Sequence, residues 1–299
     1  MSEHAGERYL VEAIRNGDPA AWREVIDRYQ GRLLSFARRR VASGADADDL
    51  VQEAFVGLLR SLPRYDPERS LETYLFAILR NKLTDHFQQA GRARKQSLDN
   101  LDPAEQPADW VESETPSRRM EEQEALGEQR GALVSALRGW AEQCCEQRRF
   151  DDLIVVEMLV VLGLRNKEVA TDLGMTETAV AGVKFRVLDQ WRKLTQASPA
   201  ARDWQEADLA RDSSVARIWQ SEGVSCPKRS TLGRHLLGAL DADWVRFVDF
   251  HVTTAACDRC IANLDDLRSE DQRDEATRSA LRERCFASSV GFLSRAPGS

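Results

Sequence analysis

The chain has 299 residues, of which 42% are hydrophobic and 30% charged, and its formal net charge is −7 at pH 7. This length and apolar content suffice for two or three small domains with cores of their own. No apolar run approaches the length of a membrane span and the first twenty residues are not signal-like, so we expect a cytoplasmic protein without membrane contact. In that compartment the six cysteines suggest metal or thiol chemistry rather than a disulfide frame.

An acidic helix start is predicted at residues 46–53. Carboxylates in a first turn cap free amides and face the positive end of the helix dipole. Apolar residues then recur at helical spacing, which leaves a polar side facing outward. A solvated helix start that binds nothing is the simpler alternative. The apolar positions are Val51, Phe55, Leu58 and Leu62, and the outward ones are Asp49, Gln52 and Glu53.

A second amphipathic helix is predicted after the turn at residues 63–67. Aromatic side chains are interleaved with its polar ones, and aromatic faces beside cations suit unpaired bases. Burial of the same rings in a core is the alternative. The positions expected inside are Leu71, Leu75, Ile78, Leu79 and Leu83, the polar side carries Arg80, Asn81, Thr84, Asp85 and Gln88, and the rings are Tyr74, Phe76 and Phe87.

Together these motifs resemble region two of bacterial sigma factors of the extracytoplasmic-function (ECF) group, over about residues 8–95. The resemblance implies that the first helix docks on RNA polymerase and that the second contacts and opens the minus-ten promoter element. It assigns polymerase binding to Asp46, Asp49, Gln52 and Glu53. It assigns DNA contact to Tyr74, Phe76, Arg80, Asn81, Lys82 and Asp85, and the loop 64–69 could hold a base flipped out of the stack.

Two departures from the family pattern concern promoter contacts. Tyr74 stands where Trp is usual, and Gln88 and Gln89 stand where Arg is usual. Fewer phosphate contacts are expected as a result.

An acidic linker is predicted between the first helices and the next motif. Residues 99–124 contain nine acids and two bases, a charge of −7 that equals that of the whole chain. With three prolines and little apolar content, we expect an extended tether.

A helix-turn-helix is predicted from residue 166 onward. A short helix over residues 166–173 leads through Gly174 to the capping Thr176, after which apolar residues recur at helical spacing up to Leu194. An ordinary pair of packed helices is the alternative. The stretch 158–194 is similar to region four of the same family, which implies contact with the minus-thirty-five element. The residues nearest DNA would be Thr176, Glu177, Thr178, Ala181, Lys184, Phe185 and Arg186.

A metal site is predicted in the C-terminal part. Cys226, His251, Cys257 and Cys260 form a set of three thiols and one imidazole suited to tetrahedral Zn²⁺, and His235 is a rival for the imidazole. The arrangement resembles a zinc-binding anti-sigma domain, although the spacing from His251 to Cys257 is two residues longer. The alternatives are a buried Cys226 with an unoccupied dithiol, or a dithiol that oxidises when metal is lost. Cys144, Cys145 and Cys285 are expected to pack in helices.

We therefore expect an all-α protein with four parts. These are residues 1–96 (region two), 97–124 (linker), 125–197 (region four) and 198–299 (zinc-binding extension). Neither a phosphate-cradling loop nor a nucleophile elbow occurs, so an enzyme is not expected. The leading hypothesis is a transcription initiation factor that binds core RNA polymerase and promoter DNA, with an anti-sigma or other regulatory protein as a further partner. The alternatives are an anti-sigma-like or redox-sensing module that cannot initiate, and a helix-turn-helix repressor.

Overall fold

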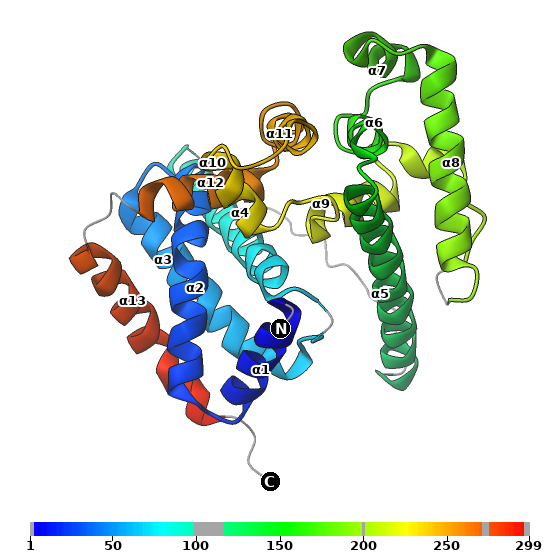
Figure 1. Cartoon of the computed structure of the whole chain (residues 1–299). Coiled ribbons are helices and arrows are strands. Elements are labelled where there is room, and N and C mark those ends of the chain that lie inside the picture. Colours follow the sequence, from blue (N-terminus) through cyan, green and yellow to red (C-terminus); the bar gives the residue numbers. More distant parts are fainter. Residues whose placement is uncertain (1–2, 68, 99–115, 199–200, 271–274, 296–299) are drawn as a thin grey trace. The chain divides into compact units, whose positions relative to one another are not determined.

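The structure, a computed structural model, describes residues 3–67, 69–98, 116–198, 201–270 and 275–295 (Figure 1). The described residues form thirteen α-helices joined by short 3-10 and π turns and contain no strand, which confirms the predicted all-α class. None of these helices combines the length and apolarity that crossing a bilayer requires. The chain divides into two compact units.

The first unit contains residues 1–102, 232–237 and 258–299. Local signals define its helix starts: Asp18 caps one helix by accepting from the Ala20 amide at 2.8 Å, and Ser43 caps the next. Its core is built on Trp22, Phe36 and Phe55. Its helices are α1 (Glu3–Arg15), α2 (Pro19–Arg38), α3 (Gly44–Ser61), α4 (Leu71–Leu98), α12 (Asp258–Glu270) and α13 (Glu275–Ser289), with 3-10 turns Leu62–Arg64 and Val290–Arg295 and the end of α10 (Arg229–Leu236).

The C-terminal helices α12 and α13 pack on this first unit. Helix α12 lies against α2, and α13 lies against α2 and α3 (Figure 1). A β-carbon on Gly31 of α2 would lie 2.0 Å from the Asp266 Oδ1 of α12, so a larger residue there would force the Asp266 side chain to move. The indole Nε1 of Trp22 donates to the Ser289 Oγ at 2.7 Å, and Phe286 joins the same apolar core. The predicted extension 198–299 is therefore divided between the two units.

A largely enclosed polar network also joins α12 to α2 and α4. The Glu72 Oε1 accepts from the Arg32 guanidinium and from the Asn263 amide, each at 2.9 Å. Arg259 donates to the Thr73 Oγ1 at 2.6 Å. Burial alone would raise the pKa of Glu72, but Arg32, Arg259 and Asn263 outweigh it, and the pKa is lowered. The carboxylate therefore links three helices as an anion.

The second unit contains residues 103–231 and 238–257. Four tryptophans centre its core: the ring of Trp191 lies 5.7 Å from that of Trp140 and 5.0 Å from that of Trp204, and Trp140 lies 5.9 Å from Trp219. Two of these rings follow residue 198, so part of the predicted extension completes this core. The elements are α5 (Pro116–Glu146), α6 (Phe150–Val160), α7 (Asn166–Leu173), α8 (Glu177–Thr195), the 3-10 turn Glu206–Leu209, α9 (Ser214–Glu222), α11 (Ala242–Asp249) and the π turn Phe250–Thr254.

The predicted acidic linker falls mainly on residues 99–115, which lie outside the described residues. Helix α5 begins at Pro116, before the predicted end of the linker at residue 124.

Candidate nucleic-acid interface and metal centre

Helix α3 presents the predicted polymerase-binding residues on its polar side. Asp49 and Glu53 are exposed, and Asp46 and Gln52 are half-buried. Glu53 lies 3.2 Å from the Lys82 Nζ of α4. An open depression runs along this side of the helix. It is lined by Asp49, Gln52, Glu53, Val56, Gly57, Arg60, Lys82 and Ser288. Three of the four predicted residues thus share one surface with α4 and α13.

The prediction that Phe76 faces DNA is wrong. Its ring is fully buried and packs edge to face on Phe36, with ring centroids 5.0 Å apart. Phe76 precedes Leu79 by three residues and Leu83 by seven, so helical geometry places all three on the buried side. The periodicity therefore already contained the signal for the core.

The remaining predicted residues of α4 lie in different surroundings. Tyr74 is half-buried against Tyr65, with ring centroids 5.1 Å apart, and the Arg69 guanidinium lies 5.3 Å from its ring centroid. Arg80 lies over the ring of Phe36, at 5.5 Å from its centroid. Asn81 and Asp85 are exposed, and Lys82 is ion-paired with Glu53.

Phe87 is a candidate that the site prediction omitted. Its ring is 48% exposed near the end of the described polar surface of α4, and it packs edge to face against His86 at 5.7 Å. An exposed aromatic ring on this helix is the feature expected of a base-stacking side chain. The signal in the sequence was its position after Leu83, the last apolar residue expected on the buried side of this helix.

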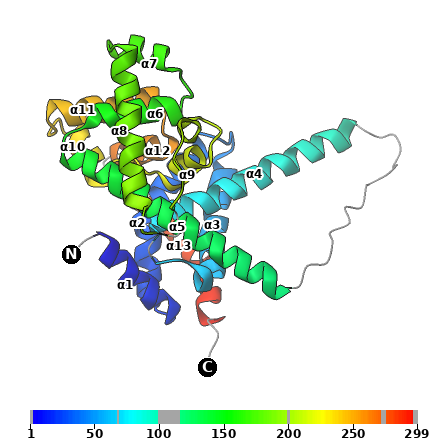
Figure 2. The ribbon, with the colours of Figure 1, turned by 90° about the vertical axis from the view of Figure 1, so that its right-hand side faces the viewer.

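Helices α7 and α8 form the predicted helix-turn-helix, and both views show them meeting at a tight turn (Figure 1; Figure 2). Gly174 ends α7 in the left-handed conformation with φ 63°, which glycine adopts without strain. The Thr176 Oγ1 accepts from the Ala179 amide at 3.1 Å and caps α8. Val169 and Val180 are buried where the helices meet. These observations confirm the predicted helices and turn.

The exposed side of α8 carries most of the residues predicted to contact DNA. Thr176, Glu177, Thr178, Ala181, Phe185 and Arg186 are exposed, and the ring of Phe185 is 72% exposed. The basic residues here are ion-paired: the Lys184 Nζ lies 2.6 Å from Glu206, and Arg186 lies 3.1 Å from Asp152.

The apolar side of α8 ends differently from the prediction. Leu194, expected inside, is 47% exposed, whereas Thr195 is fully buried. The hydroxyl of Thr195 donates to the Trp191 carbonyl at 2.9 Å and accepts from the Trp204 Nε1 at 2.9 Å. Because Thr195 satisfies both groups, it occupies the inner position four residues after Trp191.

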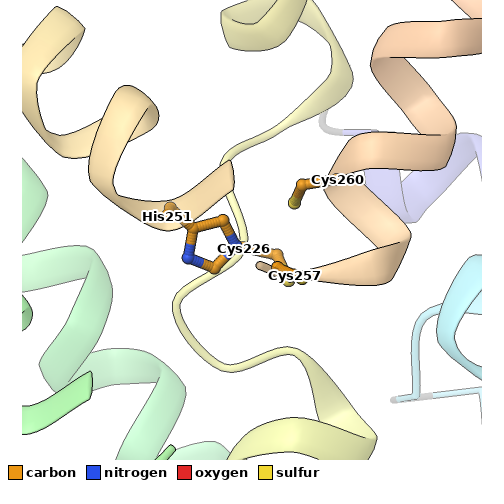
Figure 3. A group of neighbouring side chains, drawn as sticks. All are labelled: Cys226, His251, Cys257 and Cys260. Carbon is orange, nitrogen blue, oxygen red and sulfur yellow. Dashed lines mark hydrogen bonds between the residues drawn. The ribbon is translucent and has the colours of Figure 1, made fainter. Parts of the chain in front are cut away.

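The four predicted metal ligands lie together in the structure (Figure 3). The ligating atoms of Cys226, His251, Cys257 and Cys260 all lie within 4.8 Å of one another, and the Cys226 and Cys257 sulfurs are 3.5 Å apart. None of the six cysteines forms a disulfide. The rival His235, on α10, does not belong to the group. Three thiols and an imidazole at these separations fit a closed tetrahedral site for Zn²⁺.

Irregular backbone accommodates the longer spacing from His251 to Cys257. His251 lies in the π turn Phe250–Thr254, whose wider turn takes up additional residues. The Cys257 amide then donates to the His251 carbonyl at 3.1 Å, and Ala256 has a positive φ of 49°. Cys257 and Cys260 follow at the start of α12, one helical turn apart. The two additional residues therefore do not remove His251 from the ligand set.

Glu157 of α6 contacts the imidazole and was not predicted. Its two carboxylate oxygens lie 2.9 and 3.0 Å from the His251 Nδ1. Burial alone would lower the pKa of His251, but Glu157 and the neighbouring thiols of Cys226 and Cys257 outweigh it, and the pKa is raised well above its usual value. Metal binding at Nε2 must therefore displace a proton. Sequence spacing held no signal for this pair, because the two residues come from separate helices.

The other three thiols lie in helices, as predicted, and contact the apolar cores. Cys144 and Cys285 are buried, and Cys145 packs against the core of the second unit. Burial raises the pKa of Cys144 to about 12, of Cys145 to about 11 and of Cys285 to about 12. These thiols are therefore protonated and poorly nucleophilic at neutral pH.

Comparison with known proteins finds similarity to sigma factors in part of the first unit. A family model described as sigma-70 region 2 matches residues 25–93. The ECF RNA polymerase sigma-E factor of Escherichia coli (strain K12) is 35% identical over 92 residues, which are 31% of this chain and 48% of that protein. The sigma-E factor of Salmonella typhi is 34% identical over the same shares. The chain thus spans about half the length of these sigma-E relatives.

A third relative is matched over a longer stretch. The ECF RNA polymerase sigma factor SigD of Mycobacterium bovis is 29% identical over 193 residues, which are 62% of this chain and 82% of that protein. No solved structure matches the chain at a significant level. Residues 25–93 therefore match sigma-70 region 2, and the chain is similar to sigma factors of the ECF group.

Proposed function

We propose that this protein is a sigma factor that binds core RNA polymerase and directs it to promoter DNA. The observation that carries the proposal is a region 2 match whose acidic helix α3 has an open polar side, in a chain that also forms the helix-turn-helix of α7 and α8. Asp46, Asp49, Gln52 and Glu53 supply the polymerase contact in this proposal. The function is binding and positioning rather than catalysis.

The two promoter elements are assigned to α4 and α8. On α4, the exposed Asn81 and Asp85 and the half-buried Tyr74 support contact with a minus-ten element and its opening, and Arg80 and Lys82 flank them. On α8, the exposed residues from Thr176 to Arg186 support contact with a minus-thirty-five element in a major groove. The base-holding pocket in loop 64–69 belongs to this proposal; the ring of Tyr65 in that loop is buried, and residue 68 lies outside the described residues.

Reconstituted transcription tests the polymerase contact. Purified protein is added to core polymerase with promoter DNA, and binding and specific initiation are measured. Asp49→Lys and Gln52→Ala should each weaken polymerase binding because they change the open side of α3. Glu12→Lys is the matched control, since Glu12 is an exposed acid on α1 outside residues 25–93. The proposal fails if the wild-type protein does not bind the polymerase or adds no specific initiation.

The C-terminal helix α13 supports regulation of the same surface. The Arg284 guanidinium lies 2.5 Å from Asp48 of α3, and Ser288 lines the depression that contains Asp49, Gln52 and Glu53. A partner that docks on this side of α3 must fit beside α13 or displace it. We therefore include restraint by α13 in the proposed function. The same restraint is the way in which an anti-sigma-like inhibition of α3 would act within one chain.

Charge reversal at Arg284 tests this restraint. Arg284→Glu replaces the ion pair with repulsion from Asp48 and should loosen α13, so polymerase binding should become tighter. Arg268→Glu is the control, because Arg268 is an exposed α12 residue that pairs with Asp265 instead. Unchanged or weaker polymerase binding by the Arg284 variant would exclude α13 as a restraint.

The metal centre is proposed to hold one Zn²⁺ in a structural or regulatory role. When bound, zinc would supply a fixed tetrahedral link among its four ligands. The thiols of Cys226, Cys257 and Cys260 are also the candidates for a redox response, since the remaining three thiols have raised pKa values. Zinc content measured with and without peroxide, alongside transcription, tests this role.

A further inference from the structure

Helix α6 contains a carboxylate that its apolar surroundings do not explain. The helix reads FDDLIVVEMLV, and Glu157 is fully buried within it. An uncompensated carboxylate at such a position is costly, so a buried acid requires a specific partner. Among the described residues, that side-chain partner is His251, through both carboxylate oxygens. The pair joins α6 to the π turn within the second unit.

The geometry leaves the second nitrogen of the imidazole directed to the thiols. With Nδ1 donating to Glu157, Nε2 is the nitrogen whose lone pair can bind a metal once its proton is displaced. Nε2 is fully buried, has no hydrogen-bond partner among the described residues and belongs to the four-ligand group (Figure 3). A carboxylate behind a ligating histidine fixes the ring orientation and tautomer and increases the basicity of the ligand.

We propose that Glu157 is the positioning residue of the metal centre and that it couples metal occupancy to the helix-turn-helix. Helix α6 packs against both α7 and α8. A metal bound by His251 therefore stabilises the ring orientation in which Nδ1 donates to Glu157. The hydrogen bond to Glu157 in turn stabilises the position of α6. Because coupling between two events is reciprocal, a change in α6 must also alter metal affinity. The inference rests on the proposed metal site but not on polymerase or DNA binding.

Metal affinity is the first measurement. Full-length Glu157→Ala should bind Zn²⁺ about 10 to 100-fold more weakly than wild type in competition with a chelating dye. Glu157→Gln keeps a neutral acceptor for Nδ1 and should fall between the two. Asp152→Asn is the matched control, since Asp152 is a buried acid of the same helix that pairs with Arg149 and Arg186 instead. Its Zn²⁺ affinity should be unchanged.

Spectroscopy and hydrogen exchange separate positioning from general stability. Co²⁺ in the wild-type site should show the visible absorption of a tetrahedral thiolate and imidazole set, and Glu157→Ala should shift this absorption toward that of His251→Ala. Chelation should increase amide exchange in α6 and α7 of the wild type, whereas Glu157→Ala should exchange faster already and respond less to chelation.

The outcomes distinguish the inference from the proposed site. If the wild type binds no metal, or if His251→Ala binds it as tightly as wild type, both fail. If binding depends on His251 but Glu157→Ala binds within twofold of wild type with an unchanged Co²⁺ spectrum, the positioning role alone is overturned. If affinity depends on Glu157 but chelation leaves exchange in α6 and α7 unchanged, the coupling is overturned.

Discussion

Helices α3 and α8 are both proposed to bind other macromolecules, but their surroundings restrain them differently. Helix α13 of the same chain packs alongside α3, and its Arg284 forms an ion pair with Asp48 of α3. On α8 the polar side is open, while Lys184 and Arg186 are neutralised by Glu206 and Asp152. Access to α3 therefore depends on packing, and attraction at α8 depends on charge. The first restraint is specific and cooperative, whereas the second is graded and sensitive to salt.

The largest expected effect is on stability, and it tests whether the two units have separate cores. Trp22→Ala removes a fully buried ring beside α13, and Trp140→Ala removes one from the tryptophan cluster of the second unit. Each should lower the unfolding free energy of its own unit by about 3–5 kcal/mol. Calorimetry or hydrogen exchange measures this. Equal destabilisation of both units by either variant would contradict two separate cores.

The next effect concerns the packing of α12 on α2 and α4, and how the stability that it provides depends on pH. Glu72→Gln should destabilise the first unit by about 3 kcal/mol, because it leaves Arg32 and Arg259 without their anion. The pKa of Glu72 is lowered by folding, so its stabilisation is present above the ordinary value of 4.5 and is lost as pH falls through the folded value. Denaturation at pH 7 and at lower pH should show the difference between wild type and variant shrinking. A constant difference would contradict this account.

At α8, Phe185 and Val183 separate binding from folding. Phe185→Ala removes an exposed ring and should change stability by less than about 0.5 kcal/mol while weakening promoter binding about tenfold, or about 1.4 kcal/mol. The buried neighbour Val183→Ala should instead destabilise the second unit. Duplex binding and thermal unfolding measure the two effects. Full promoter affinity in the Phe185 variant would show that this side of α8 does not contact DNA.

The smallest effect measures the charge restraint directly. Glu206→Gln releases the Lys184 Nζ, now 2.6 Å from the carboxylate, for contact with a phosphate. One added contact should make the slope of log K against log salt more negative by about 0.9. Asp212→Asn is the control, because it removes an exposed acid of the same unit without releasing Lys184. The same change in both variants would reflect net charge rather than this ion pair.

Elements whose signals are local could be predicted from the sequence. The amphipathic periodicity of α3 and α4 and the Gly174–Thr176 turn all appear in the structure at the expected residues. Phe76 is instructive, because its periodicity indicated the core whereas the resemblance indicated DNA, and the core position is the one observed. The four ligands were also accessible, since thiols and imidazoles in such a set have a restricted chemistry.

The sequence by itself determined the helices of α3, α4, α7 and α8, the position of the turn in the helix-turn-helix, and the side chains that can bind a metal. The helices and the turn depend on residues within a few turns of one another, and the ligands are identified by their chemistry. Only the tertiary structure decided that α13 lies beside the acidic helix, that Glu206 neutralises Lys184, and that Glu157 holds His251. These pairs are distant along the chain or lie on separate elements. They form because the burial of apolar surface brings these helices together. The pattern of each helix indicates how much apolar surface it must bury, but not which other helix covers that surface.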